Sequence, residues 1–327
     1  MAFKICTVGC GGMANGGHGP SFRKYAQERE GVVLAGCCDV DLQKAEDYRG
    51  KFGFQKAYTD MEEMLKAEKP DAVSLVVPVA LTERLSIQVM EMGYPVILEK
   101  PPGMDREQTL RMMEVAERTG IPNQVSFNRR FMPIIRRFKE LRQGMQGQLW
   151  QYEFYRINRH DADFSTTSIH GIDTMKFLAG SDYKSVRFFY YPNPVDPGMA
   201  PAITLECTFQ DGQAGRITFA PGTGIAAERC TMHGSNEMIY ATMPYHGNKG
   251  SLDENGLITI ARMGQIVHQE PGIAAEDCVE NGFYGENAHF FDCIRAGIRP
   301  TDDIASGLQS VEIADCIRKG KDSYFCE

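Results

Sequence analysis

A lysine at the end of a short apolar segment is the residue of this chain best suited to chemistry. Residues 94–98 read Tyr-Pro-Val-Ile-Leu, and Glu99-Lys100-Pro101 follows at once. An amine at the end of a buried strand packs poorly. It is well placed to meet a ligand, because ligands of open α/β sheets bind beyond the carboxyl ends of the strands. We expect Lys100 to face a ligand; the alternative is a salt bridge to Glu99 or to a neighbouring carboxylate.

A glycine-rich turn supplies the second chemical signal. Gly9-Cys10-Gly11-Gly12-Met13-Ala14 comes directly after the apolar segment Lys4–Val8 and has the GxGxxA form of the dinucleotide fingerprint. In this pattern Gly9 permits the tight turn and Gly11 lets the backbone approach a pyrophosphate. Ala14 is small enough for a helix to pack on the strand. The pattern predicts a dinucleotide site at the first strand.

An acidic residue marks the end of the next predicted strand. Asp39 follows Val32–Cys38, and neither Arg nor Ser comes directly after it. A carboxylate there can accept hydrogen bonds from ribose hydroxyls and repels a 2′-phosphate, which favours NAD(H) over NADP(H). The alternative is a turn or helix-capping residue. The loop that contains His18 is longer than a minimal fingerprint requires, which could shift the helix start or bring His18 toward the site. We interpret His18 as a flexible loop residue.

The elements that must position these residues alternate between strand and helix in the N-terminal part of the chain. Apolar segments separated by helical periodicity predict a parallel, doubly wound sheet. We expect strands at Lys4–Val8, Val32–Cys38, Ala72–Val77 and Val96–Leu98, with helices at Ser21–Glu28, Leu42–Phe52, Thr82–Met92 and Arg106–Thr119.

The pattern changes after Pro122. A basic amphipathic helix is expected over Phe131–Gln143, with its arginines, Arg130 included, on a solvated face. Five segments rich in aromatic and β-branched residues follow between residues 149 and 233, and Asp211-Gly212 is typical of a hairpin turn. We therefore predict an α/β chain with two domains. These are a Rossmann domain over residues 1–122 and an α+β domain over residues 123–327, which has a large, mostly antiparallel open sheet and terminal helices.

Composition excludes several functional classes. The 327 residues carry a net charge of −8 with no basic block, so nucleic acid is not an expected partner. No run of about 20 apolar residues indicates a membrane span, and the N-terminus lacks a signal-peptide pattern, so we expect a cytoplasmic protein. The ten cysteines are scattered, and the seven histidines show no HxH or HExxH spacing, so we expect reduced thiols and no metal site.

Taken together and in order, the motifs resemble those of the Gfo/Idh/MocA oxidoreductases, named for glucose–fructose oxidoreductase and inositol dehydrogenase. The resemblance covers nearly the whole chain. It depends on the GxGxxA turn and on four later motifs: Val77-Pro78, Glu99-Lys100-Pro101, Phe127-Asn128-Arg129-Arg130-Phe131 and Ile169-His170-Gly171-Ile172-Asp173.

The resemblance implies an NAD(H)-dependent enzyme that moves hydride to or from a hydroxyl or keto carbon of a sugar, cyclitol or related polyol. It makes Lys100 and His170 the catalytic candidates, and it implies a homodimer or homotetramer formed through the C-terminal sheet. The residues expected to contact the cofactor are Gly9, Gly11, Gly12, Met13, Ala14, Asp39, Val77, Pro78, Glu99, Lys100 and Asn128.

The chain departs from the family pattern in two places. Many relatives carry Asp four residues before the helix histidine, where this chain has Thr166, and Val79 replaces an Asn that often follows Pro78. A nearby acid could compensate for the first change. Asp173 could orient the His170 imidazole or simply be solvated. The candidate substrate contacts are Arg159, His160, Asp163, Thr166, Asp173 and Tyr284, although the polar loop could equally be a solvated connection and Tyr284 could only cap a helix.

Two alternative functions stay open, and the missing Asp motivates the first of them. One is NAD-dependent cleavage of glycosides by transient oxidation and elimination. The other is a sensor that binds the cofactor without catalysis.

Overall fold

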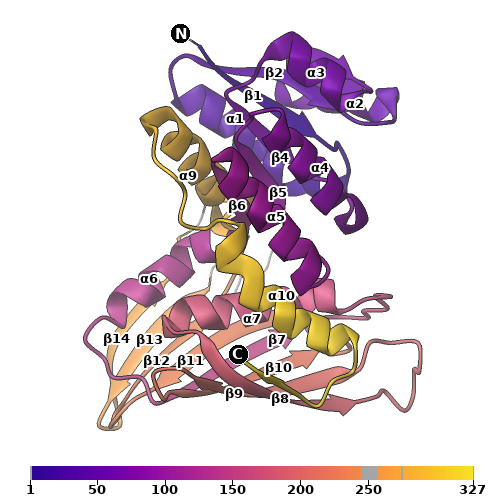
Figure 1. The fold of residues 1–327 in the computed structure, drawn as a ribbon. Helices are drawn as coiled ribbons and strands as arrows, with labels where there is room; N and C mark the ends of the chain where they lie inside the picture. The colour runs from indigo at the N-terminus through magenta and orange to yellow at the C-terminus, as the bar shows by residue number, and fades with distance from the viewer. Residues whose placement is uncertain (1, 245–255, 274, 327) are drawn as a thin grey trace. The chain divides into compact units, whose positions relative to one another are not determined.

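Six short strands form a parallel sheet in the N-terminal part of the computed structural model, which describes residues 2–244, 256–273 and 275–326 (Figure 1). The strand order is β3-β2-β1-β4-β5-β6. This is the order of a dinucleotide-binding Rossmann sheet, in which the strand order reverses between β1 and β4. The strands are β1 (Phe3–Val8), β2 (Val32–Cys38), β3 (Lys56–Tyr58), β4 (Ala72–Leu75), β5 (Val96–Glu99) and β6 (Asn123–Ser126).

Helices cover both faces of this sheet. The three that pack on one face are α1 (Gly19–Glu28), α2 (Leu42–Phe52) and α9 (Phe283–Ala296), and their aromatic rings form a buried cluster with strand residues such as Ile5 and Ile97. The other face carries α3 (Met61–Glu68), α4 (Val79–Glu91) and α5 (Arg106–Thr119). The strands are short and continuously apolar because both of their faces are covered.

The helix ends follow from local residue chemistry. Asp41, Asp60 and Asp105 cap α2, α3 and α5 by accepting backbone N–H bonds of the first turn. Gly53 and Gly120 end α2 and α5 with positive φ angles of 87° and 69°. A five-residue π-helix over Ala14–His18 precedes α1 and occupies the segment expected to be a loop.

The second sheet has nine strands in the order β14-β13-β12-β11-β7-β10-β9-β8-β15. Every neighbouring pair is antiparallel except β7 and β10. The strands are β7 (Leu149–Tyr155), β8 (Tyr183–Tyr191), β9 (Ala202–Phe209), β10 (Ala214–Ala220), β11 (Ala227–His233), β12 (Glu237–Thr242), β13 (Leu257–Arg262), β14 (Gln265–Pro271) and β15 (Ser323–Phe325). The predicted mostly antiparallel sheet is confirmed.

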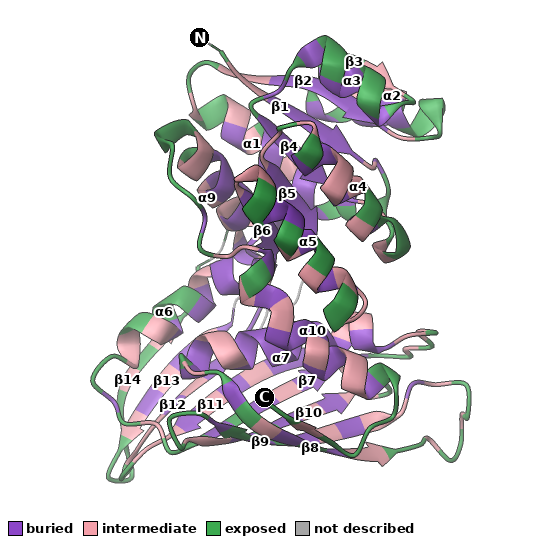
Figure 2. Ribbon diagram, viewed as in Figure 1, coloured by how far each residue is buried: buried purple, intermediate pink, exposed green. Residues whose placement is uncertain are grey.

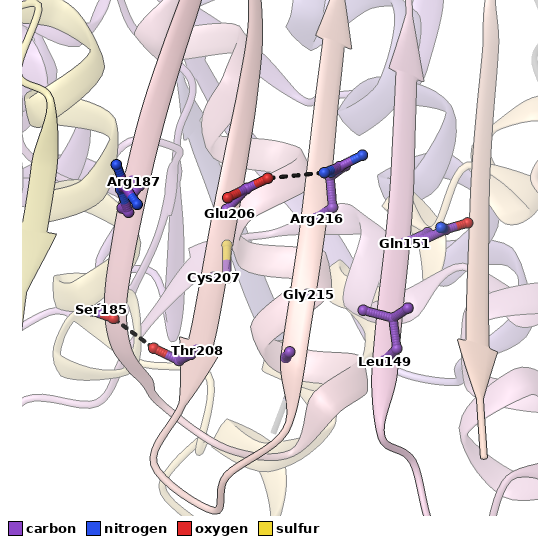
Figure 3. A pocket seen from close by; sticks show the side chains of 10 residues that line it. Leu149, Gln151, Ser185, Arg187, Glu206, Cys207, Thr208, Gly215 and Arg216 are labelled. Carbon is purple, nitrogen blue, oxygen red and sulfur yellow. Dashed lines mark hydrogen bonds and ion pairs between the residues drawn. The ribbon is translucent and has the colours of Figure 1, made fainter. Parts of the chain in front are cut away.

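One face of the large sheet is packed and the other is open. Burial alternates along β7, β9 and β10, as expected for a sheet solvated on one side. The packed face carries α7 (Ser165–Ala179) and α6 (Pro133–Leu141), the latter following a short 3₁₀ turn over Asn128–Phe131 (Figure 2). A shallow hollow on the open face is lined by Leu149, Gln151, Arg187, Glu206 and Arg216 among others (Figure 3).

Contacts divide the chain into two units differently from the sequence prediction. The first unit runs to Asn128 and also includes Asp277–Val311, whereas the second comprises Arg129–Glu276 and the residues from Glu312 onward. The short α8 (Asp277–Glu280) and α9 therefore belong with the parallel sheet, although the sequence prediction gave them to the second domain. The physical reason is that Phe290 and Phe291 of α9 fill the core over β5 and β6, a return that chain order does not reveal. The last helix is α10 (Ile304–Arg318).

Candidate active site

The glycine-rich turn lies where β1 ends, beside the end of β4. Gly9 has a φ of +95°, and a Cβ atom placed on it would lie 2.0 Å from the carbonyl oxygen of Val76. Both facts require glycine, because an L side chain would be strained and would overlap the backbone of the neighbouring strand. Gly9 therefore serves the turn, as its position in the fingerprint predicts.

Gly11 and Gly12 need a different explanation from that of Gly9. A Cβ atom on either residue would meet no described atom within 4 Å, so packing inside the protein does not demand glycine there. This open space lies beside the backbone that leads into the π-helix beginning at Ala14. The backbone N–H groups at the start of a helix favour a bound anion. A pyrophosphate that approaches the backbone closely would explain both glycines.

Asp39 is tied directly to this turn. Its Oδ2 accepts a hydrogen bond from the backbone N–H of Cys10 at 2.9 Å, and its Oδ1 accepts one from the N–H of Asp41 at 3.1 Å. Asp41, rather than Asp39, is the residue that caps α2. The carboxylate is partly exposed and keeps lone pairs for a ribose.

The remaining cofactor candidates lie on three segments of the first unit. Met13 is 48% exposed beside the glycine turn, and Val77 and Pro78 connect β4 to α4. Asn128 is buried, and its side-chain amide donates to the carbonyl oxygen of Asn281 at 2.7 Å. The fold thus assembles Met13, Val77 and Pro78 at the edge of the sheet, whereas the amide of Asn128 ties β6 to the segment before α9.

Lys100 follows the last residue of β5, at the same edge of the sheet, and is half-buried. Its backbone N–H donates to Oε2 of Glu99 at 3.1 Å. The carboxylate of Glu99 is buried, and its Oε1 lies 2.8 Å from Nε2 of His18. Burial alone would raise the pKa of Glu99, but the hydrogen bond from His18 and the charge of Lys100 hold it below the usual value.

The interpretation of His18 as a flexible loop residue is wrong. Its ring is 1% exposed at the end of the π-helix and lies against the rings of Phe22 and Phe283. The flanking glycines explain the tight packing, because a Cβ atom on Gly17 would lie 2.8 Å from the ring of Phe283, and one on Gly19 would lie 2.5 Å from the ring of Phe52. The two glycines beside a histidine were the available sequence signal.

In the second unit, His170 lies in the second turn of α7 and is half-buried. Thr166, one turn earlier, donates its hydroxyl to the backbone carbonyl of Asp163 at 3.0 Å. Asp173 is 1% exposed, and both of its oxygens accept hydrogen bonds from Arg130, at 2.6 and 2.8 Å. Arg130 is not solvated as expected, and the solvated alternative for Asp173 is wrong as well, because the two residues pair and join α7 to the turn before α6.

The polar loop before α7 is held by its own ion pairs. The guanidinium of Arg159 binds Asp161 through two hydrogen bonds of 2.6 and 2.9 Å. His160 is paired with Asp196 at 2.8 Å, and this hydrogen bond raises the pKa of His160. One oxygen of Asp163 accepts the N–H of Ser165, and the other is buried without a hydrogen-bond partner among the described residues.

Tyr284 belongs to the first unit. Its hydroxyl donates to Glu28 of α1, and burial together with that carboxylate raises its pKa to about 12. The hydroxyl is therefore used in joining α9 to α1.

Sequence reasoning missed a buried charge cluster in the second unit. Glu228 accepts two hydrogen bonds from Arg129, at 2.6 and 2.8 Å, one from the Tyr152 hydroxyl at 2.7 Å, and one from Arg156. Burial opposes its ionisation, but the two arginines hold the pKa of Glu228 far below the usual range. The sequence signal was the alternation of side chains along β11. Glu228, Cys230 and Met232 are each two residues apart, so they point to the same face of the strand, and Cys230 and Met232 are buried.

Two further features concern the described residues only. They contain no group of three or more His, Cys, Asp and Glu side chains arranged to hold a metal ion, and all ten cysteines are free thiols. None of the helices in these ranges combines the length and apolar character needed to cross a bilayer.

The sheet order and the geometry of the Gly9–Ala14 turn define the first unit as a dinucleotide-binding Rossmann domain. Residues 3–127 match a family described as "Oxidoreductase family, NAD-binding Rossmann fold", the Gfo/Idh/MocA family. This match covers the first unit, where the predicted resemblance to the Gfo/Idh/MocA oxidoreductases and the predicted Rossmann domain are confirmed.

Comparison with individual proteins agrees. An inositol 2-dehydrogenase of Corynebacterium glutamicum is 32% identical over 198 residues, which are 58% of this chain and 58% of that protein. The scyllo-inositol 2-dehydrogenase (NAD(+)) of Bacillus subtilis is 25% identical and matches 79% of this chain and 77% of its own length. A crystal structure of a dehydrogenase from Chromobacterium violaceum superposes with a TM-score of 0.84 at 19% identity, covering 98% of this chain and 95% of its own. Matches to the first relatives thus span little more than half of their length, whereas the fold is shared throughout.

Proposed function

We propose that this protein is an NAD(H)-dependent oxidoreductase that transfers hydride to or from a hydroxyl or keto carbon of a sugar, cyclitol or related polyol. The observation that carries the proposal is the placement of Lys100. The residue follows β5 at the edge of the sheet where the glycine turn follows β1 and Asp39 follows β2. Ligands of this fold bind outside that edge.

The residues present fit a bound NAD. The open space over Gly11 and Gly12 and the N–H groups that follow suit its pyrophosphate, and the carboxylate of Asp39 suits a ribose that carries two free hydroxyls. A 2′-phosphate would be repelled by Asp39, and the next two residues, Val40 and Asp41, offer no cation. NAD would supply the hydride acceptor in oxidation and the hydride donor in reduction.

In this proposal Lys100 is the acid–base group. When an alcohol is oxidised, the neutral amine accepts the hydroxyl proton as hydride leaves the same carbon; in reduction, the ammonium returns that proton to the forming alkoxide. His170 is proposed to act on the same oxygen, as the resemblance of its motif implies. The substrate contacts proposed for Arg159, His160, Asp163 and Thr166 rest on their positions in the polar loop and at the start of the helix that carries His170. Asp173 and Tyr284 are not proposed again, because they bind Arg130 and Glu28.

Binding and turnover test the function in two steps. Calorimetric titration should give tighter binding of NAD⁺ than of NADP⁺. Nicotinamide absorbance is then recorded with a panel of cyclitols, aldoses and keto-sugars, and at least one should give continuous reduction of NAD⁺. Binding without turnover on the whole panel would contradict the proposal. Cleavage of aryl glycosides without net NADH would instead support the alternative reaction.

A further inference from the structure

A set of hydrogen bonds among buried side chains leads to the backbone of Lys100. It begins at Asn287 of α9, whose side-chain Nδ2 donates to the carbonyl oxygen of Phe283 at 2.8 Å and lies 3.1 Å from Nδ1 of His18. It continues from Nε2 of His18 to Oε1 of Glu99 at 2.8 Å and ends where Oε2 of Glu99 accepts the N–H of Lys100. His18, Glu99 and Asn287 are all buried.

The hydrogen-bond partners of His18 fix which of its two ring nitrogens carries the proton. The amide nitrogen of Asn287 is a donor only, so Nδ1 of His18 must accept, and the ring proton is on Nε2. Nε2 therefore donates to Glu99, and a carboxylate is the form of Glu99 that accepts best. The two glycines beside His18 allow this contact, since larger residues would overlap the rings of Phe283 and Phe52.

A second carboxyl group approaches Glu99 from α9. Glu286 is fully buried, and neither of its oxygens has a hydrogen-bond partner among the described residues. Burial raises the pKa of Glu286 well above the usual value, and the charges of Glu99 and Asp302 raise it further, which favours its neutral form. Of the two carboxyl groups, Glu99 is the one whose ionised form has a side-chain hydrogen-bond donor, Nε2 of His18.

We propose that His18 is a positioning residue that acts through Glu99: its hydrogen bond keeps the Glu99 carboxylate ionised and fixed, and this single buried charge sets the protonation of Lys100. The inference rests on the proposed function, in which Lys100 must be neutral to accept a proton. The groups that act on Glu99 are His18 from the π-helix, Glu286 from α9 and Lys100 itself, whereas Asn287 of α9 contacts His18.

The test is the pH dependence of kcat for alcohol oxidation in four variants. His18→Leu leaves a buried carboxylate without its donor, so Glu99 takes up a proton and Lys100 loses the neighbouring negative charge. The ammonium form of Lys100 is then less stabilised. The acidic limb of the profile of kcat against pH should therefore move about one pH unit toward lower pH. Glu99→Gln should give the same shift, and His18→Leu combined with Glu99→Gln should shift no further. His18→Gln, which retains an amide donor, should restore most of the wild-type profile.

Structural damage would give a different result. A His18→Leu protein with a lower melting temperature but the wild-type pH profile would overturn the proposal, as would a shift of equal size in the Glu99→Gln background. His289→Leu, which also changes a histidine packed in the first unit, serves as the control and should leave the limb unmoved.

A readout without turnover separates this inference from the proposed function. The rate of acetylation of Lys100 as a function of pH, followed by peptide mass spectrometry, reports the state of the amine directly. The same shift in His18→Leu should appear there even if no substrate is turned over. Identical acetylation profiles in wild type and His18→Leu would overturn the inference alone.

Discussion

Asp39 serves two requirements with one carboxylate. It holds the N–H of Cys10 in the glycine turn, and it presents its remaining lone pairs at the edge of the sheet. Its position after β2 made the residue predictable, but the bond to the turn was not, because it depends on the end of β1 lying beside the end of β2. We propose that Asp39 in this way couples the shape of the turn to the choice of cofactor.

Replacing Asp39 should alter that choice. Asp39→Ser removes the charge that repels a 2′-phosphate. It also weakens the hydrogen bonds to a ribose and to the backbone N–H of Cys10. Hydrogen bonds to charged groups contribute about 1.5–3 kcal/mol, so NAD⁺ affinity should fall about tenfold or more while NADP⁺ affinity rises or stays constant. Calorimetry with both cofactors measures the ratio, and an unchanged preference would show that Asp39 is only a turn residue.

Side-chain chemistry on the sequence predicted where Lys100 and Glu99 lie, but not how His18 and Glu286 pack beside them. A lysine after an apolar strand is visible without a structure, because the strand end predicts where the residue lies. His18 and Glu286 are different, since each is buried by segments far from it in the chain. In the sequence, a histidine among glycines suggests a mobile loop. In the structure, the rings of Phe283 and Phe52 pack against the glycines on either side of His18.

At the scale of elements, α7 is anchored by a buried ion pair. Arg130 and Asp173 make two hydrogen bonds, and their side chains are 8% and 1% exposed. Removing one partner leaves an uncompensated buried charge, so Asp173→Asn should lower the free energy of unfolding by about 3–5 kcal/mol. The measurement is urea unfolding. Asp182→Asn, which breaks an exposed pair with Lys176, should cost only about 0–1 kcal/mol, and equal losses would argue against a structural role for Asp173.

Glu286 should make the stability of the first unit depend on pH. The folded protein holds a proton on Glu286 at pH values where the unfolded chain has released it. Stability is therefore complete below the ordinary carboxyl pKa of about 4.3 and falls as pH rises above it. Glu286→Gln carries no such proton, so its stability relative to wild type should increase between about pH 5 and pH 8. Urea unfolding at both pH values measures this, with Glu114→Gln on the exposed face of α5 as the control; a constant difference would show that Glu286 is ionised.

The elements themselves were largely predictable, and their exceptions have physical causes. The strands β1, β2 and β5 and the helices α2 and α5 follow from apolar runs and capping residues. The short β3 and β6 escape notice because three or four residues give no periodicity. The π-helix was missed because its glycines favour a loop when read locally. Packing against Phe283 requires glycine at Gly17 of the π-helix, and packing against Phe52 requires it at Gly19, the first residue of α1.

At the scale of the whole molecule, the open face of the large sheet is the surface that needs a partner. Leu149 is 41% exposed there, within the hollow that also contains the Arg216–Glu206 pair (Figure 3). We predict a homo-oligomer formed through this face. Leu149→Glu should shift the mass measured by light scattering toward the monomer, because a buried unpaired charge opposes association.

A loop substitution provides the control for that experiment. Val195→Glu changes a residue that is 91% exposed outside the strands and should leave the mass unchanged. A wild-type protein that is already monomeric would contradict the prediction.

The class of fold was accessible from the sequence because strand–helix alternation and then aromatic, β-branched segments persist over long stretches. The return of α8 and α9 to the parallel sheet could not be predicted from the sequence, because nothing local indicates that Phe290 and Phe291 complete a distant core. For the same reason the division into units could be predicted near Asn128 but not at Asp277.

The central claim is that Lys100 is the proton-transfer residue of an NAD-dependent oxidoreductase, and Lys100→Met tests it most directly. The variant keeps the length of the side chain and loses the amine. With a substrate found for the wild type, kcat should fall by about 10²–10⁴-fold while the NAD⁺ dissociation constant changes little. Turnover within a few fold of wild type, with the cofactor still bound, would contradict the claim.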